Sequence, residues 1–337
     1  MSADGPLLVA TDLTREYPVR GTRQLLTAVA GVSLGLQRAE TLGIVGESGC
    51  GKSTLARLLV RLEDPTSGRV ELDGVDVTAL GHGALTAFRR RVQMVFQDPY
   101  ASLNPRITVG HTLDEVLTVH RLGSRDERRR RVGELLDRVG LGGRFANRYP
   151  HQLSGGQRQR VGIARALAVE PDVIVLDEPL SALDVSVQSG IMNLLTELRD
   201  ELGVAYVFIS HDLGMVRHIS HRIAVMYLGR VVELGRWEPV SDDPLHPYTR
   251  ALQQAVPIAD PAVEATRHVE TLVGEVPDPA DPPSGCPFHP RCPLAEEICR
   301  EIRPELVEVY DAHEVACHVA VREAGVSEFG LAERREG

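Results

Sequence analysis

Hydrophobic and polar residues alternate in blocks along most of the chain, and these blocks predict strands and helices. Segments 7–13 and 28–36 are rich in residues that favour strands. Short apolar runs at 41–45 and 173–176 have the length and composition of strands that are buried on both faces. The first of these runs is followed, at 53–62, by apolar residues at helical spacing. Strands that alternate with helices in this way predict an α/β protein with a parallel sheet.

A polar stretch in the middle of the chain also predicts a helix. In RDERRRRVGELLDRVGL, residues 125–141, apolar side chains recur at helical spacing among many arginines. The arginines could contact nucleic acid or lipid headgroups, but the acidic residues between them favour a helix face that is exposed to water. We expect this segment to belong to a helical insertion at about 98–165. Its apolar positions are Val132, Leu135, Leu136 and Val139.

The alternation weakens after Val231–Gly235, and proline becomes frequent. The segment EVPDPADPPSGCPFHPRCP, residues 275–293, predicts an ordered loop or linker, because proline interrupts helices and central strands. We therefore predict a catalytic domain at 1–240, which includes the helical subdomain at about 98–165, and a C-terminal extension at 241–337.

Composition and charge narrow the function. The 337 residues suffice for one large domain with an extension, and 43% hydrophobic with 25% charged residues is an ordinary globular composition. The net charge of −10 argues against a general nucleic-acid binder, so we expect no nucleic-acid partner. The sequence shows no signal-peptide pattern and no apolar run near the ~18 residues that cross a bilayer. We therefore expect a soluble chain that works at a membrane only through other subunits.

The strongest motif lies between the first apolar run and the helix that follows it. The sequence from Gly46 to Thr54 fits the phosphate-binding pattern G-x-x-x-x-G-K-[ST] at every fixed position. Glycine lets the backbone turn tightly so that its N–H groups point at phosphate oxygens, while Lys52 reaches the β- and γ-phosphates and Ser53 binds Mg²⁺. The predicted nucleotide-binding residues of this loop are Gly46, Glu47, Ser48, Gly49, Cys50, Gly51, Lys52, Ser53 and Thr54.

A pair of acids ends the second apolar run. Asp177 closes the predicted strand and can hold Mg²⁺ beside the phosphate-binding loop. Glu178 follows directly and has the position of a general base that activates water. Two acids at the end of a strand would be common by themselves. Together with the loop, they predict metal-assisted hydrolysis of a nucleoside triphosphate.

A second glycine-containing helix start occurs within the sequence LSGGQ. Its two glycines lead into a helix with apolar residues at helical spacing, and the N-terminus of such a helix can bind an anion. Since the first loop already cradles the nucleotide, the second helix start predicts a site that another subunit completes. The residues assigned to it are Ser154, Gly155, Gly156 and Gln157.

Taken in order, these motifs resemble those of ATP-binding cassette (ABC) ATPases. LSGGQ is similar to the family signature, and Ser181–Asp184 resembles the D-loop. Tyr17 resembles the aromatic residue that stacks on adenine, Gln97 the glutamine of the Q-loop, and His211 the switch histidine. The resemblance covers most of the chain. It implies a P-loop NTPase fold with a RecA-like core, an antiparallel β subdomain and an α-helical subdomain that carries the signature.

The resemblance also implies a mechanism. Two nucleotide-binding domains would stack head to tail, with each ATP between the P-loop of one domain and the signature of the other. Glu178 would polarise the attacking water, while Lys52 and His211 would stabilise charge on the phosphates. Gln97 would complete the catalytic set. The implied Mg²⁺ ligands are Ser53, Gln97 and Asp177, and Asp184 is a further implied nucleotide-site residue.

Longer stretches indicate the branch of the family. GESGCGKST, FQDPYASLNPR, DEPLSALDVSVQ and HPYTRAL together resemble the ATPase subunits of oligopeptide and dipeptide importers, of the F-type rather than the D-type. This implies a D-type partner ATPase, two transmembrane permease subunits, an extracytoplasmic substrate-binding protein and a peripheral position at the cytoplasmic face of the membrane. The segment Asp98–Gly110 would lie near the permeases. A nickel importer, a soluble nucleic-acid-associated ABC ATPase and an exporter ATPase remain open as alternatives.

Four of the five cysteines lie in the extension, with the spacing C-x5-C-x6-C-x17-C. In a cytosolic chain, clustered thiols favour a metal over disulfides. The spacing matches neither the usual zinc knuckle nor the common ferredoxin patterns, so zinc (with His289 or His318), an iron–sulfur cluster and no metal all remain open. The family resemblance implies a [4Fe-4S] cluster with a structural or regulatory role. The four cysteines are Cys286, Cys292, Cys299 and Cys317.

Overall fold

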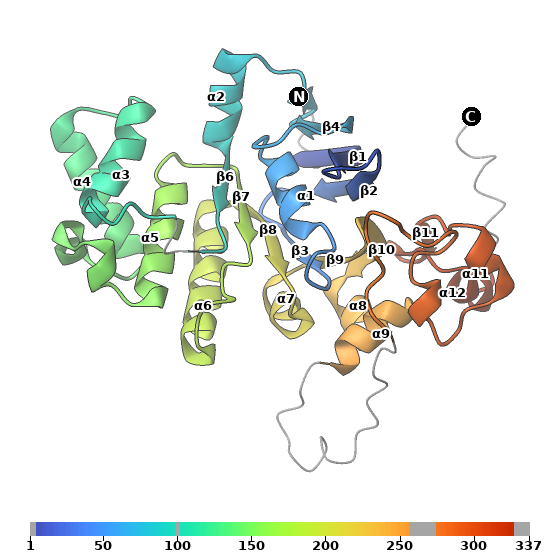
Figure 1. Ribbon diagram of the computed structural model, residues 1–337. Coiled ribbons are helices and arrows are strands. Elements are labelled where there is room, and N and C mark those ends of the chain that lie inside the picture. The colour runs from blue at the N-terminus through green and yellow to red at the C-terminus, as the bar shows by residue number, and fades with distance from the viewer. Residues whose placement is uncertain (1–4, 99–101, 256–273, 327–337) are drawn as a thin grey trace, which may run out of the picture.

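The computed structural model describes residues 5–98, 102–255 and 274–326. An eight-stranded sheet, with the strand order β11-β12-β10-β9-β3-β8-β7-β6, forms its centre, and a second sheet has the order β2-β1-β4-β5 (Figure 1). The strands are β1 (Leu8–Pro18), β2 (Leu25–Leu36), β3 (Thr41–Val45), β4 (Ser67–Leu72), β5 (Val75–Asp76), β6 (Val92–Val95), β7 (Val173–Asp177), β8 (Ala205–Ser210), β9 (Arg222–Tyr227), β10 (Arg230–Arg236), β11 (Val307–Tyr310) and β12 (His313–Val315).

The parallel part of the central sheet comprises β9, β3, β8, β7 and β6. Alternate residues of its strands enter two separate hydrophobic clusters: Val173 and Val175 pack on one face, and Ile174 and Leu176 pack on the other. Both faces of the sheet are therefore buried, as the apolar runs predict. The predicted α/β class and parallel sheet are confirmed.

Helix α1 shares one hydrophobic cluster with the antiparallel sheet, and helices α5, α6 and α7 share the other. The strand predictions at 7–13 and 28–36 are confirmed by β1 and β2, which pair with each other. No helix in the described part of the chain is both long and apolar enough to cross a membrane. The α-helices are α1 (Lys52–Leu59), α2 (His82–Arg91), α3 (Val109–Val119), α4 (Arg125–Arg138), α5 (Gly155–Leu167), α6 (Val185–Leu202), α7 (Leu213–Ile219), α8 (Trp237–Asp242), α9 (Pro247–Gln254), α11 (Glu297–Glu301) and α12 (His318–Glu323); the 3₁₀ helices are η1 (Gly143–Asn147), η2 (Pro150–Gln152) and η3 (His289–Arg291).

The segment predicted as a helical insertion contains α3, α4, η1, η2 and most of α5. Helices α3 and α4 pack on each other and on α5, at the end of the molecule opposite the C-terminal extension (Figure 1). Helix α4 begins with a capping box, in which Ser124 and Glu127 bond each other's backbone N–H groups. Its four predicted apolar positions are buried, which confirms the helix face.

The C-terminal extension contributes two strands to the central sheet, because β12 pairs with β10 and β11 pairs with β12. Glu233 of β10 is fully buried. Its carboxylate accepts hydrogen bonds from the N–H groups of Leu245 and His246, and Nε2 of His313 lies 2.7 Å from it. The described residues of the proline-rich segment contain no α-helix, as predicted. The boundary near residue 240 stays a prediction.

Candidate nucleotide site

The P-loop connects β3 to α1 and folds around the side chain of Lys52. The Nζ atom of Lys52 donates hydrogen bonds to the carbonyl oxygens of Gly46, at 2.7 Å, and Glu47, at 2.9 Å, and only 4% of the residue is exposed. Gly51 has a φ of 104°, and a side chain there would meet the carbonyl oxygen of Ala28 at 2.0 Å. Only glycine fits this position, which explains the glycine that precedes the lysine of the motif.

Ser53 and Asp177 meet beside the P-loop. The Ser53 hydroxyl donates a hydrogen bond to Oδ1 of Asp177 at 3.0 Å, which joins the start of α1 to the end of β7. Burial raises the pKa of Asp177, and the hydrogen bond from Ser53 opposes this shift. A hydroxyl oxygen and a carboxylate are the protein ligands that P-loop ATPases offer to Mg²⁺. The two side chains therefore fit the predicted magnesium position.

Three polar side chains converge beyond the end of β7. Nε2 of Gln97 donates a hydrogen bond to Oε2 of Glu178 at 3.0 Å, and Nδ1 of His211 lies 3.5 Å from the same oxygen. Glu178 has a φ of 43°, in the left-handed region that residues other than glycine rarely occupy. Strain of this kind is concentrated at functional sites. The backbone thus holds one carboxylate where an amide and an imidazole both reach it.

Except for Asp177, the side chains described above line one open cavity of about 550 Å³. The ring of Tyr17 forms part of the wall, and the guanidinium of Arg15 lies over it, with 4.7 Å between Cζ and the ring centroid. The Tyr17 hydroxyl donates a hydrogen bond to Glu63. A cavity that combines an aromatic ring with a phosphate-binding loop fits a nucleotide. The described lining residues are Tyr17, Leu26, Thr27, Ala28, Ser48, Gly49, Gly51, Lys52, Ser53, Thr54, Gln97, Glu178, His211, Leu228, Gly229 and Pro279.

Some lining residues carry no signal that the sequence analysis could detect. Leu228 and Gly229 form the turn between β9 and β10, and Gly229 donates its N–H to the carbonyl of Cys50 at 2.8 Å. Pro279 belongs to the proline-rich segment, which the sequence analysis assigns only to the extension. Small and apolar side chains such as these have no chemistry that marks them as a site. They reach the cavity because the fold brings distant segments together.

The second predicted phosphate-binding helix start lies apart from this cavity. Ser154 caps α5 by accepting a hydrogen bond from the N–H of Gln157 at 3.3 Å, and the Gln157 side chain accepts one from the N–H of Ser154 at 3.0 Å. Asp184 caps α6 in a similar way. Of the described residues that line the cavity, none comes from either helix start. The site composed of two chains therefore remains a prediction.

The four cysteines of the extension line one small cavity of about 10 Å³. Burial raises the pKa of Cys286 and Cys292 to about 11, and hydrogen bonds from the backbone N–H groups of Phe288 and Leu294 oppose the shift. Among the described residues, no group of three or more His, Cys, Asp or Glu side chains is placed to hold a metal ion. The metal-binding part of the predicted extension is therefore not shown, although the thiols do gather in one place.

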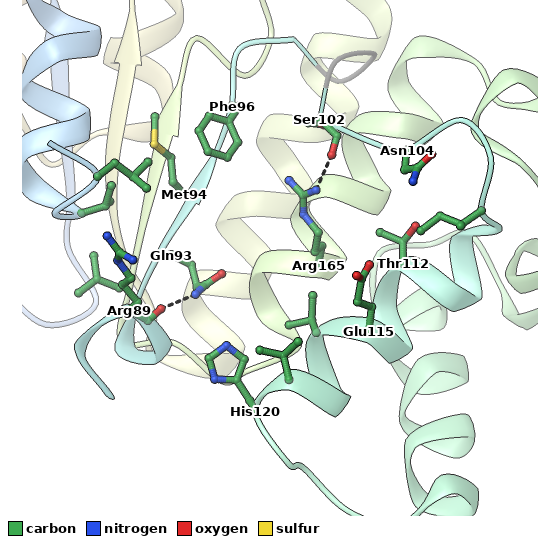
Figure 2. Close-up of a pocket in the computed structure, with 16 residues that line it drawn as sticks. Arg89, Gln93, Met94, Phe96, Ser102, Asn104, Thr112, Glu115, His120 and Arg165 are labelled. Carbon is green, nitrogen blue, oxygen red and sulfur yellow. Dashed lines mark hydrogen bonds between the residues drawn. The ribbon is translucent and has the colours of Figure 1, made fainter. Parts of the chain in front are cut away.

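A groove of about 500 Å³ separates the core from the helical subdomain (Figure 2). In its wall, the guanidinium of Arg165 donates a hydrogen bond to the carbonyl oxygen of Ser102 at 2.5 Å. Of the segment 98–110, Ser102, Asn104 and Ile107 line the groove, and residues 99–101 lie outside the described residues. The most exposed apolar residues that line the groove are Phe96, Leu62 and Val119, with exposed fractions of 41%, 48% and 69%.

Comparisons with known proteins agree with this geometry. The ABC transporter family matches residues 29–181, and the family described as oligopeptide/dipeptide transporter, C-terminal region, matches residues 232–299. The probable peptide ABC transporter ATP-binding protein y4tS of Sinorhizobium fredii is 54% identical over 318 residues, which cover 93% of this chain and 90% of the relative. The oligopeptide transport ATP-binding protein AppF of Bacillus subtilis is 50% identical over 319 residues, which cover 93% and 97% of the two chains.

The dimeric ATP-binding cassette MJ0796, solved in a post-hydrolysis state bound to ADP and Pi, is 36% identical. It superimposes with a TM-score of 0.62, covering 68% of this chain and 98% of the solved one. The fold and the nucleotide cavity together define an ABC ATPase. The chain belongs to the ATP-binding subunits of ABC transporters, in the oligopeptide and dipeptide importer branch.

Proposed function

We propose that this chain hydrolyses ATP to power the import of oligopeptides or dipeptides by a binding-protein-dependent ABC transporter. The observation that carries the proposal is the single cavity where Tyr17, Lys52, Gln97, Glu178 and His211 come together from separate parts of the sequence. The peptide substrate is supported by the relatives named above, which are peptide transport proteins that match over nearly their whole length.

One group of residues binds the nucleotide. Tyr17 stacks on adenine, and the ammonium of Lys52, together with the N–H groups of the P-loop, holds the β- and γ-phosphates. Ser53 and Asp177 would hold Mg²⁺, which would neutralise charge on the phosphates. Binding of the cation also favours the ionised form of Asp177, against the effect of burial.

A second group carries out hydrolysis. Glu178 accepts a proton from water as the water oxygen attacks the γ-phosphorus, and the bond to the bridging oxygen breaks to leave ADP and phosphate. His211, which reaches the same carboxylate, stabilises charge on the transferred phosphoryl group. Gln97 donates a hydrogen bond to Glu178, and its side chain would be a further ligand for Mg²⁺.

The second half of each ATP site comes from another ATPase subunit. The capped start of α5, with Ser154, Gly155, Gly156 and Gln157, would face the γ-phosphate in the P-loop of a D-type partner, and Asp184 would lie near it across the interface. The separation of this helix start from the cavity in one chain supports this arrangement. The dimeric state of the solved cassette MJ0796 supports it as well.

The groove between the core and the helical subdomain would receive the permeases. Its exposed apolar residues and its position beside Gln97 suit a contact that senses nucleotide binding. Two permease subunits and an extracytoplasmic binding protein would complete the transporter, with this chain at the cytoplasmic face of the membrane. Peptide uptake into proteoliposomes that contain the assembled transporter tests the proposal. ATP-dependent peptide uptake that Lys52→Met abolishes is expected; uptake of nickel but not peptide would overturn the peptide substrate.

We also propose that the extension, starting near residue 240, binds a [4Fe-4S] cluster, with zinc as the alternative. The donor set supports it, since four thiols line one cavity and backbone N–H groups point at the sulfurs of Cys286, Cys292 and Cys317. A cavity of about 10 Å³ holds no more than a water molecule. The cysteine side chains would therefore have to move apart around a cluster.

Metal analysis of protein purified without air tests this site. We expect about four irons and four sulfides per chain with a visible absorption band, and loss of both in Cys292→Ser. The matched control is Cys50→Ser, which alters the one cysteine outside the extension and should keep the metal. One zinc without colour would favour the alternative, and metal-free protein of full thermal stability would overturn the site.

A further inference from the structure

Glu47 of the P-loop is held in place by residues from the C-terminal part of the chain. Its carboxylate accepts two hydrogen bonds from Arg291, at 2.8 Å from Nη1 and 3.0 Å from Nη2. Its N–H donates to the hydroxyl oxygen of Tyr248 at 2.8 Å, and its carbonyl accepts the bond from Lys52. The residue is thus fixed at its side chain and on both sides of its backbone. Arg291 and Tyr248 both lie beyond residue 240.

Arg291 is itself placed by tight packing, with only 6% of its side chain exposed. Its Cζ lies 5.9 Å from the ring centroid of Tyr227, and its N–H donates to the carbonyl of Phe288 within the turn η3. The Phe288 ring packs edge-on against Tyr227, at 5.3 Å between centroids, and lies 5.5 Å from Tyr248. The next residue, Cys292, lines the four-cysteine cavity. The guanidinium therefore has little freedom to leave Glu47.

The charge of Glu47 matters because the loop around it binds an anion. An unpaired carboxylate in the P-loop would repel the phosphates, and charges with little exposure are only weakly screened by salt. Arg291 cancels this charge through a bidentate contact, the strongest geometry for an arginine and a carboxylate. The Arg291 side chain is buried and that of Glu47 is 26% exposed, and an ion pair in such a place adds little stability compared with apolar side chains. The pair therefore serves the binding loop more than the general stability of the fold.

We infer that Arg291 is a positioning residue for ATP binding, and that it makes the nucleotide affinity of the P-loop depend on the C-terminal extension. It neutralises Glu47 and fixes the backbone whose carbonyl holds Lys52. The inference rests on the proposed ATP site, and it requires no metal in the extension.

Titration of the full-length chain with a fluorescent ATP analogue and Mg²⁺ tests the inference. We expect Arg291→Gln to weaken binding about tenfold, and the double variant Arg291→Gln with Glu47→Gln to bind more tightly than Arg291→Gln alone, because the unpaired charge is then gone. In the assembled transporter, Arg291→Gln should raise the KM for ATP and leave kcat near the wild-type value. The matched control is Arg322→Gln, which removes another bidentate arginine, paired with Glu296, from the same extension.

Rescue in the double variant separates a charge effect from a loss of structure. Should Arg291→Gln fail to fold, Arg291→Lys is the second variant, because it keeps the positive charge and loses the bidentate contact to Glu47. We expect Arg291→Lys to weaken binding about threefold. Wild-type affinity in Arg291→Gln and Arg291→Lys would overturn the inference. A double variant that binds as weakly as Arg291→Gln would overturn it as well. Lys52→Met reports on the ATP site itself. If Lys52→Met abolishes binding while Arg291→Gln has no effect, the inference is wrong and the proposed ATP site stands. If Lys52→Met has no effect on binding, the proposed ATP site is wrong.

Discussion

Helices α1 and α5 both begin at a glycine-containing turn, but only one of these helix starts faces the nucleotide cavity of its own chain. The start of α1 wraps its backbone around Lys52 and presents Ser53 to Asp177. The start of α5 has its side chains bonded to its own backbone, through Ser154 and Gln157. At the first start, Lys52 and Ser53 line the cavity of their own chain. At the second start, the side chains cap their own helix, and none of the described residues that line the cavity comes from it.

The difference shows that a helix start can have its own backbone groups capped and still not contribute to the nucleotide cavity of its own chain. Helix α4 begins with the same capping box as α5, formed by Ser124 and Glu127, and serves only to start a helix. Helix α5 differs by the pair of glycines after the serine, and a side chain at Gly156 would meet Cγ1 of Val187 in α6 at 2.4 Å. In the proposed transporter, the phosphates of a nucleotide held by a second chain would lie against this capped helix start.

The largest effect on ATP hydrolysis should come from Glu178, whose carboxylate lines the same cavity as the start of α1. Glu178→Gln keeps the hydrogen bond to Gln97 but cannot accept a proton, so we expect ATP hydrolysis by the assembled transporter to fall by about 10²- to 10⁴-fold. ATP affinity should stay close to that of the wild type. Steady-state ATPase assays and nucleotide titration measure the two quantities. Glu134→Gln, at an exposed carboxylate of α4, is the control and should alter neither.

A smaller effect should come from the aromatic wall of the same cavity. Tyr17→Ala removes the ring that stacks on adenine, and stacking on an aromatic side chain contributes about 1–3 kcal/mol. We expect ATP to bind about 5- to 100-fold more weakly, with kcat little changed. Tyr17→Phe keeps the ring and loses only the hydroxyl contact to Glu63, so its affinity should stay within about twofold. Equal losses in both variants would contradict stacking.

Motifs made of neighbouring residues could be predicted from the sequence because their chemistry is local. Gly51 has a φ of 104° that favours glycine, and Asp177 ends a strand whose apolar run is visible in the sequence. The structure adds the convergence of Gln97, Glu178 and His211, which the family resemblance only implies.

Contacts between distant segments could not be predicted. Glu47 and Arg291 are 244 positions apart, and nothing in either local sequence indicates the other. Strand β12 has only three residues, too few for an alternating pattern to show, although it extends the central sheet beside β10. Such contacts depend on how helices and strands pack against each other after they form, and the residues that determine this packing are spread over the whole chain.

The central claim is that the start of α5 belongs to the ATP site of a partner subunit. Ser154→Asp tests it most directly, because aspartate caps a helix as well as serine does but would set a negative charge against the partner's γ-phosphate. Ser124→Asp makes the same change at the capping box of α4. We predict that Ser154→Asp lowers ATP hydrolysis by the assembled transporter about 100-fold or more, since like charges 4 Å apart repel by about 4 kcal/mol near a protein surface. ATP binding by the isolated chain should not change, and Ser124→Asp should affect neither. Equal activity of the two variants, or weaker ATP binding by the isolated Ser154→Asp chain, would contradict the account.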